Sequence, residues 1–170
     1  MPVSFCCYDF CEAHWEKYGY LYTLSAVTNT KESPQSYHEN FIDSLLSPDG
    51  WQIPTLDDWF NLHKMLNDSQ GVRPDKYLGG WIEPNVQEVM KSTESWESKL
   101  NVQNPLGLNI LASGYLSHKG NFMDLGRCAE IWLATVTGPD FDHRHFITLG
   151  CNSSHVVPEM ASVRLVKKAE

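Results

Sequence analysis

The chain has 170 residues, of which 42% are hydrophobic and 20% are charged, and it carries a formal net charge of -8. This length fits one domain with a substantial core, so residues 1–170 are expected to form a single domain. The composition gives no sign of disorder and no apolar run long enough to span a membrane, and the excess of acidic residues argues against a nucleic-acid partner.

The N-terminal residues MPVSFCCYDFCEAHW have no basic start, no long apolar segment and no small-residue cleavage site, so they are not expected to be a signal peptide. The cysteines are odd in number and lack paired CxxC spacing, so neither a full disulfide framework nor a zinc ribbon is indicated. We predict buried or free thiols for all of them: Cys6, Cys7, Cys11, Cys128 and Cys151.

Two segments in the first third of the chain predict regular structure. Residues 18–27, YGYLYTLSAV, are rich in aromatic and aliphatic residues and predict a strand that leads into a short helical or extended segment. Residues 36–46 place Tyr37, Phe41 and Leu45 at four-residue spacing, which predicts an amphipathic helix.

The stretch DGWQIPTLDDWFNLHKML, residues 49–66, predicts an extended entry that leads into a helix. Thr55 can cap the helix, and Asp58 three residues later completes a capping box. The residues before Pro54 are expected to run extended. The buried face of the helix is predicted from residues at helical spacing, with the histidine at the edge of the core: Leu56, Trp59, Phe60, His63 and Leu66.

A further helix is predicted from Pro84 to Ser92, followed by a polar loop to Asn104 that carries Trp96. Short apolar runs separated by glycine then predict strands. Because helices precede strands, the expected class is α+β with a mostly antiparallel sheet and two to three helices. The predicted strands lie within residues 106–117, 120–126, 130–138, 145–154 and 161–168.

Six of these segments, in order, resemble the Fibrobacter succinogenes major paralogous domain family, which has a C-type lectin-like fold. The resemblance covers the chain from about Cys7 to Lys168. The segments that carry it are KYGYLYTLSAV, DGWQIPTLDDWFNL, VMKSTESW, LNILASGYLSHKGNFMDLG, EIWLAT and ASVRLVK.

Several positions depart from the family pattern. The resemblance implies one bridge between positions that here hold Ser47 and Leu165, and a second bridge that survives only as Cys7, with Trp15 in the other place. Because disulfides persist in oxidising compartments, missing bridges favour maturation in a reducing cytoplasm.

A lectin-like scaffold implies binding through loops, so we expect a protein or glycan ligand at loops 136–146 and 152–159. His143 and His145 have the spacing to chelate a metal with His155 or Cys151, but two solvated histidines need no metal, and no metal or other cofactor is predicted. Candidate contact residues are Trp132, Asp140, Phe141, Asp142, His143, Arg144, His145, Asn152 and His155.

The tripeptide at residues 83–85, Glu-Pro-Asn, matches a sugar-binding motif of calcium-dependent lectins, but it lies directly before a helix, where a cap and a helix-start proline explain it. No hydrolase, zinc-protease or phosphate-loop motif is present. The resemblance also implies an alternative, an oxidoreductase of the formylglycine-generating kind that uses Cys128 and Cys151.

We therefore expect a non-enzymatic binding or structural module. Two settings fit it, a phage virion component and a bacterial surface protein of the adhesion type. The same expectation leaves room for a homo-oligomer or for assembly in a larger particle.

Overall fold

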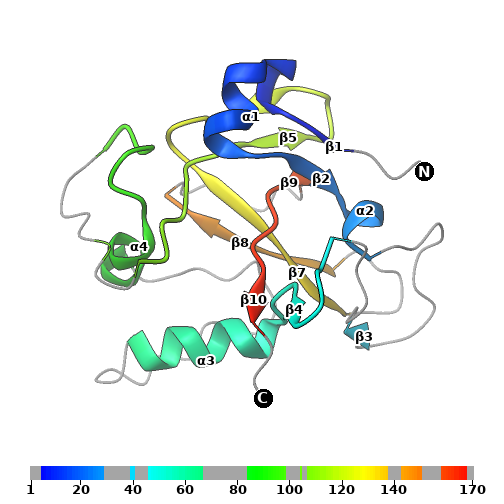
Figure 1. Cartoon of the computed structure of the whole chain (residues 1–170), viewed down its shortest axis with the longest axis vertical. Helices are drawn as coiled ribbons and strands as arrows, with labels where there is room; N and C mark the ends of the chain where they lie inside the picture. Colours follow the sequence, from blue (N-terminus) through cyan, green and yellow to red (C-terminus); the bar gives the residue numbers. More distant parts are fainter. Residues whose placement is uncertain are drawn as a thin grey trace.

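The computed structural model describes residues 5–28, 39–40, 46–66, 84–98, 104, 107–137, 143–150 and 158–167 (Figure 1). Within these ranges the chain forms four α-helices, one 3-10 helix and ten strands. The elements are β1 (Phe5–Cys6), η1 (Tyr8–Phe10), α1 (Glu12–Tyr18), β2 (Leu21–Thr23), α2 (Leu24–Thr28), β3 (Glu39–Asn40), β4 (Trp51–Gln52), α3 (Leu56–Leu66), α4 (Pro84–Met90), β5 (Tyr115–Ser117), β6 (Phe122–Met123), β7 (Ala129–Thr137), β8 (His143–Leu149), β9 (Pro158–Ala161) and β10 (Val166–Lys167).

The strands form three sheets, with orders β1-β2-β9-β5-β6, β10-β4 and β3-β7-β8. Every pairing between these strands is antiparallel. The predicted α+β class with mostly antiparallel sheets is therefore confirmed, although the described residues hold four α-helices where two to three were expected.

Strand β7 is the centre of the fold, and both of its faces are buried. Ala129, Ile131 and Leu133 pack into one apolar cluster with residues of α3 and α4. Trp132 and Ala134 point to the opposite side and join a second cluster. Since successive side chains of a strand alternate between faces, a strand buried on both faces reads as the nearly continuous apolar run seen in this sequence.

The helix start predicted at Thr55 is confirmed. The backbone N–H of Asp58 donates to Thr55 Oγ1 at 3.1 Å, and the backbone N–H of Thr55 donates to Asp58 Oδ2 at 2.8 Å, which is a capping box. The junction is also attached to β7, because the N–H of Leu56 donates to Thr135 Oγ1 at 2.9 Å. The segment before the helix thus forms the short strand β4, and the start of α3 that follows it is attached to the central strand.

Three other predicted elements are confirmed in part. The strand and helix of 18–27 appear as β2 and α2, and the helix that begins at Pro84 appears as α4. Trp59 and His63 are buried on α3, as predicted. In the predicted strand 106–117, the described residues are 107–117, and among these only Tyr115–Ser117 is a strand.

The helix predicted over residues 36–46 is wrong at Glu39–Asn40, which form strand β3. These two residues pair with Val136 and Thr135 of β7. Pairing with the edge of a central strand overrides the local helical spacing, because backbone hydrogen bonds to a neighbouring strand replace those within a helix. Residues 36–38 and 41–45 lie outside the described residues.

Both predicted binding loops, 136–146 and 152–159, include residues that belong to strands. Residues 136–137 and 143–146 belong to β7 and β8, where Thr137 pairs with His143 and Val136 pairs with Arg144. Residues 158–159 begin strand β9. The polar residues that suggested loops are therefore partly taken up by strand pairing, and residues 138–142 and 152–157 lie outside the described residues.

Candidate functional site: an exposed aromatic surface

Trp132 is a core residue, so its prediction as a contact residue is wrong. Its side chain is 0% exposed, and its indole N–H donates to the backbone carbonyl of Tyr22 at 2.8 Å. Its ring lies edge-to-face against Phe146, with centroids 6.1 Å apart. A partner has no access to this side chain, because it is fully buried. It joins β7 to β2 through its hydrogen bond to Tyr22.

The other predicted contact residues fall into two groups. The backbones of His143, Arg144 and His145 lie in strand β8. The remaining candidates lie outside the described residues: Asp140, Phe141, Asp142, Asn152 and His155.

The cysteines also differ from expectation at one position. Cys128 is fully buried and disulfide-bonded, so the prediction of a thiol there is wrong. Cys6, Cys7 and Cys11 are free thiols, as predicted. Because Cys128 has no exposed surface, its sulfur offers no accessible nucleophile in this conformation.

Sequence reasoning missed a buried carboxyl group, Glu130, which is 2% exposed on strand β7. Thr148, directly opposite on β8, donates its hydroxyl to Glu130 Oε2 at 2.8 Å. The pKa of Glu130 is raised to about 8, mainly by burial, with a smaller rise from the charge of Asp124 and an opposing decrease from the hydrogen bond of Thr148. A glutamate at the start of the apolar run EIWLA was the available signal for this site.

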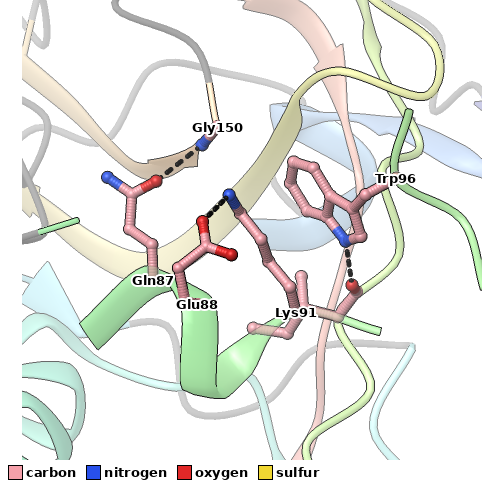
Figure 2. Close-up of polar contacts among 6 residues, drawn as sticks. Gln87, Glu88, Lys91, Trp96 and Gly150 are labelled. Carbon is pink, nitrogen blue, oxygen red and sulfur yellow. Dashed lines mark hydrogen bonds and ion pairs between the residues drawn. The ribbon is translucent and has the colours of Figure 1, made fainter. Parts of the chain in front are cut away.

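The family segment VMKSTESW forms a compact polar cluster between α4 and the following turn (Figure 2). Lys91 is buried, and its Nζ lies 2.6 Å from Glu88 Oε1 and 4.7 Å from the centre of the Trp96 ring. The Trp96 indole N–H donates to the carbonyl of Ile110 at 2.9 Å. Figure 2 shows these side chains directed at one another, so the motif serves to join α4 to its neighbours.

Replacing Lys91 with methionine is expected to lower the free energy of unfolding by about 2 kcal/mol. The change removes the cation from Trp96 and leaves the Glu88 carboxylate without its ion pair, and the partial exposure of Glu88 keeps the loss moderate. Urea unfolding of the single variants Lys91→Met and Glu88→Gln and of the double variant measures this. Strictly additive losses would show that the two side chains do not interact.

Exposed aromatic side chains gather at the end of the molecule that carries β1, η1 and α1. Phe5 is 60% exposed, Phe10 is 76% exposed and Trp15 is 39% exposed. Exposed apolar groups that lie together mark interaction surfaces more often than single ones do. Trp51, 42% exposed, lies on β4 beside α3, which Figure 1 places at the opposite end from α1.

Four aromatic rings at the α1 end form what we call the aromatic platform: Phe5, Trp15, Tyr20 and Tyr22. The rings of Trp15 and Tyr20 are stacked, with an angle of 5° between their planes and 5.8 Å between their centroids. Phe5 contacts Tyr20 edge-to-face at 5.0 Å and lies directly opposite Tyr22 in the β1–β2 pairing. Each ring therefore fixes the position of its neighbour.

The local sequence explains how the platform forms. Gly19 ends α1 with φ 77, a conformation that favours glycine, and its N–H donates to the carbonyl of Trp15 at 2.9 Å. The chain then reverses, which returns Tyr20 to Trp15. Leu21 points into the core at 1% exposure, so the alternation of a strand directs Tyr20 and Tyr22 to the other face.

A second group of rings, called the Phe10 group, consists of Tyr8, Phe10 and Phe122. Phe10 lies edge-to-face against Phe122 with centroids 5.2 Å apart. Its backbone has φ 53, and the preceding Asp9 has φ 54. Left-handed backbone costs a residue with a side chain of this size about 1–2 kcal/mol. The fold thus holds a highly exposed phenylalanine in a strained conformation, as binding sites often do.

The charge around the platform is acidic. The exposed carboxylates on α1 belong to Glu12 and Glu16, Asp9 is exposed on the preceding η1, and the exposed ammonium on α1 belongs to Lys17. Lys17 Nζ lies 5.0 Å from the centre of the Tyr18 ring. Burial raises the pKa of the Tyr22 phenol, so this group stays uncharged at neutral pH.

Two kinds of site are absent from the part of the chain that the structure describes. It contains no group of three or more His, Cys, Asp or Glu side chains that could hold a metal ion. It also contains no helix long and apolar enough to cross a membrane.

The sequence carried a signal for the platform that we did not use. Aromatic residues are dense in the segments FCCYDF and WEKYGYLY. Trp15 stood out only as the occupant of a position that the family pattern gives to cysteine. Density alone does not say which rings are exposed, because that depends on the turn at Gly19 and on the pairing of β1 with β2.

Searches for similar curated proteins and for similar solved structures found no match. A family model, the Fibrobacter succinogenes major domain, matches residues 2–167, which is nearly the whole chain. The order of motifs from the strand of YGYLY to the closing strand β10 agrees with this match. The chain therefore belongs to the Fibrobacter succinogenes major domain family.

Proposed function

We propose that the chain is a non-enzymatic binding module on a C-type lectin-like scaffold, and that it contacts its ligand through the exposed aromatic surface formed by the aromatic platform and the Phe10 group. The ligand is a protein or a glycan on a cell or particle surface. The observation that carries the proposal is the gathering of exposed Phe5, Phe10 and Trp15 at one end of the fold.

The physical argument is that folding alone does not favour this arrangement. Rings that stay exposed contribute little hydrophobic free energy to folding. Phe10 also occupies a strained backbone conformation. Aromatic side chains are the residues most enriched at binding hot spots, because they bury a large area and lose few rotamers. A surface that is unfavourable for the isolated chain is expected to be used when a partner covers it.

The surroundings of the described polar groups support binding in preference to catalysis. Lys91 is engaged by Glu88 and Trp96, and Cys128 is disulfide-bonded and fully buried. Glu130 is bonded to Thr148 beneath the surface. Lys91, Cys128 and Glu130 thus each interact with other residues of the fold.

Two settings remain in the proposal, a bacterial surface protein and a phage virion component. The disulfide at Cys128 favours the surface setting, because disulfides persist in oxidising surroundings. This differs from the expectation of a reducing cytoplasm drawn from the missing family bridges. In either setting the aromatic surface faces outward from the assembled structure.

The test measures binding of the labelled chain to an array of cell-envelope fractions from a panel of bacteria. Wild type is expected to bind at least one fraction saturably. The variant Phe10→Ser/Trp15→Ser is expected to lose affinity by about tenfold or more, since each ring contributes about 1 kcal/mol to a stacked or edge contact.

Trp51→Ser is the matched control, because Trp51 is as exposed as Trp15 but lies on β4. It is expected to bind like wild type. Equal binding by wild type and the Phe10→Ser/Trp15→Ser variant, or no saturable binding by wild type, contradicts the proposed function. Circular dichroism and thermal melting establish that each variant is folded.

A further inference from the structure

We infer that the aromatic platform recognises uncharged glycans, with a sugar ring lying against the exposed part of Trp15 and sugar hydroxyls donating to the carboxylate of Glu12. This inference rests on the proposed function, because it names the ligand class of the same surface. Three features of the platform carry it: the exposed ring of Trp15, the fixed position of the rings and the charges beside them.

Trp15 and Tyr20 lie one partly over the other. Their ring planes differ by 5° and their centroids are 5.8 Å apart, so each ring covers part of one face of the other, and Trp15 keeps 39% of its surface exposed. An aromatic face is electron-rich, and it attracts the slightly positive C–H groups on the face of a pyranose ring. The exposed area of the Trp15 ring is therefore complementary to the apolar face of a sugar ring.

The platform is also held in place before any ligand arrives. Phe5 supports Tyr20 edge-to-face at 5.0 Å, and the turn at Gly19 fixes Tyr20 against Trp15. Rings that are already ordered lose little conformational freedom on binding. This matters for a sugar, because one ring contact gives only a modest gain that an ordering cost would cancel.

The charges beside the platform select against acidic ligands. Glu12 lies three residues before Trp15 on α1, so both side chains are on the same side of the helix. A carboxylate accepts hydrogen bonds from hydroxyl groups, and it repels carboxylate or phosphate groups. With Glu16 also exposed on α1, the favoured ligand is polyhydroxylated and uncharged.

A protein partner fits the platform less well. A stable protein interface covers about 800 Å² on each partner. The α1 side chains on the same side of the helix as Trp15 are the exposed, charged Glu12 and the half-buried Tyr18, so the exposed apolar contact on α1 is small. One or two sugar units match that extent.

The experiment presents wild type and variants to an array of neutral glycans and of glycans that carry uronic or sialic acids. Wild type and Trp51→Ser are expected to bind neutral glycans, and Trp15→Ser is expected to lose about tenfold or more in apparent affinity. Glu12→Gln is expected to weaken neutral binding and to reduce discrimination against acidic glycans. Binding to acidic glycans only, neutral binding that is unchanged in Trp15→Ser, or no glycan binding overturns the inference.

A second arm separates this inference from the proposed function. Envelope fractions that bind wild type are treated with periodate, which cleaves sugar diols, or with protease. Loss after periodate and survival after protease supports a glycan ligand. Loss after protease alone, with binding still dependent on Trp15, overturns the glycan inference and leaves the proposed function standing. Binding that does not depend on Trp15 or Phe10 overturns both.

Discussion

Replacing Glu130 with glutamine is expected to stabilise the chain at neutral and alkaline pH and to flatten the dependence of its stability on pH. Glu130 is 2% exposed, and burial raises its pKa from the ordinary 4.5 to about 8. Below about pH 4.5 the carboxyl is protonated in both the folded and the unfolded chain, so it adds no pH dependence there.

Between about pH 4.5 and about pH 8 the unfolded chain releases the proton while the folded chain keeps it. Stability therefore falls as pH rises through this window, and the loss reaches about 3 kcal/mol at pH 7, because one pKa unit corresponds to about 1.4 kcal/mol. Above the folded pKa both states are ionised and the loss is constant.

Glutamine does not titrate, and its carbonyl oxygen can still accept the hydrogen bond from Thr148. Urea unfolding of wild type and of Glu130→Gln at about pH 5, 7 and 8.5 measures the difference. The variant is expected to be favoured by about 2 kcal/mol at pH 7, after a small cost for the new amide N–H groups. If the free energy of unfolding falls with pH equally in wild type and in Glu130→Gln, the prediction is contradicted. Glu94→Gln, a change at an exposed glutamate, serves as the control.

Replacing Trp132 with alanine is expected to lower the free energy of unfolding by about 3–5 kcal/mol, which is the usual cost of emptying a fully buried tryptophan position. The change also leaves the Tyr22 carbonyl without the indole N–H that it accepts at 2.8 Å, and it removes the edge contact with Phe146. For a chain of this size that loss removes much of the total stability.

Two further variants give the Trp132 result its meaning. Trp132→Phe keeps an aromatic ring in the core but loses the hydrogen bond and part of the buried volume, so it is expected to cost about 1–3 kcal/mol. Trp51→Ala removes a half-exposed ring and is expected to cost less than about 1 kcal/mol. A Trp132→Ala variant as stable as wild type contradicts the core assignment of this residue.

Local signals were enough to predict some elements of the fold. The capping box of Thr55 and Asp58 is formed by residues three apart, so the sequence shows it directly. The alternating and continuous apolar runs around Ile131 predicted strands for the same reason, because strand period and burial are local properties.

Other features depend on partners far away in the sequence. Glu39 and Asn40 pair with β7 almost a hundred residues later, and nothing in their helical spacing shows that. The sequence leaves Trp132 open between a contact residue and a core residue, because aromatic residues serve both interfaces and cores, and only its position on β7 decides between them. The platform likewise requires the β1–β2 pairing and the turn at Gly19.

The most direct test of the aromatic surface is two-dimensional nitrogen-15 NMR of the tryptophan indole N–H groups, recorded while a bound envelope fraction or array-positive glycan is added. The tryptophans among the described residues include probes of the surface and of the core. We predict that the Trp15 signal shifts or broadens during the titration, while the signals of exposed Trp51 and of buried Trp96 and Trp132 stay in place. A shift of Trp51 with no change at Trp15 would place the ligand at the other end of the molecule and contradict the account.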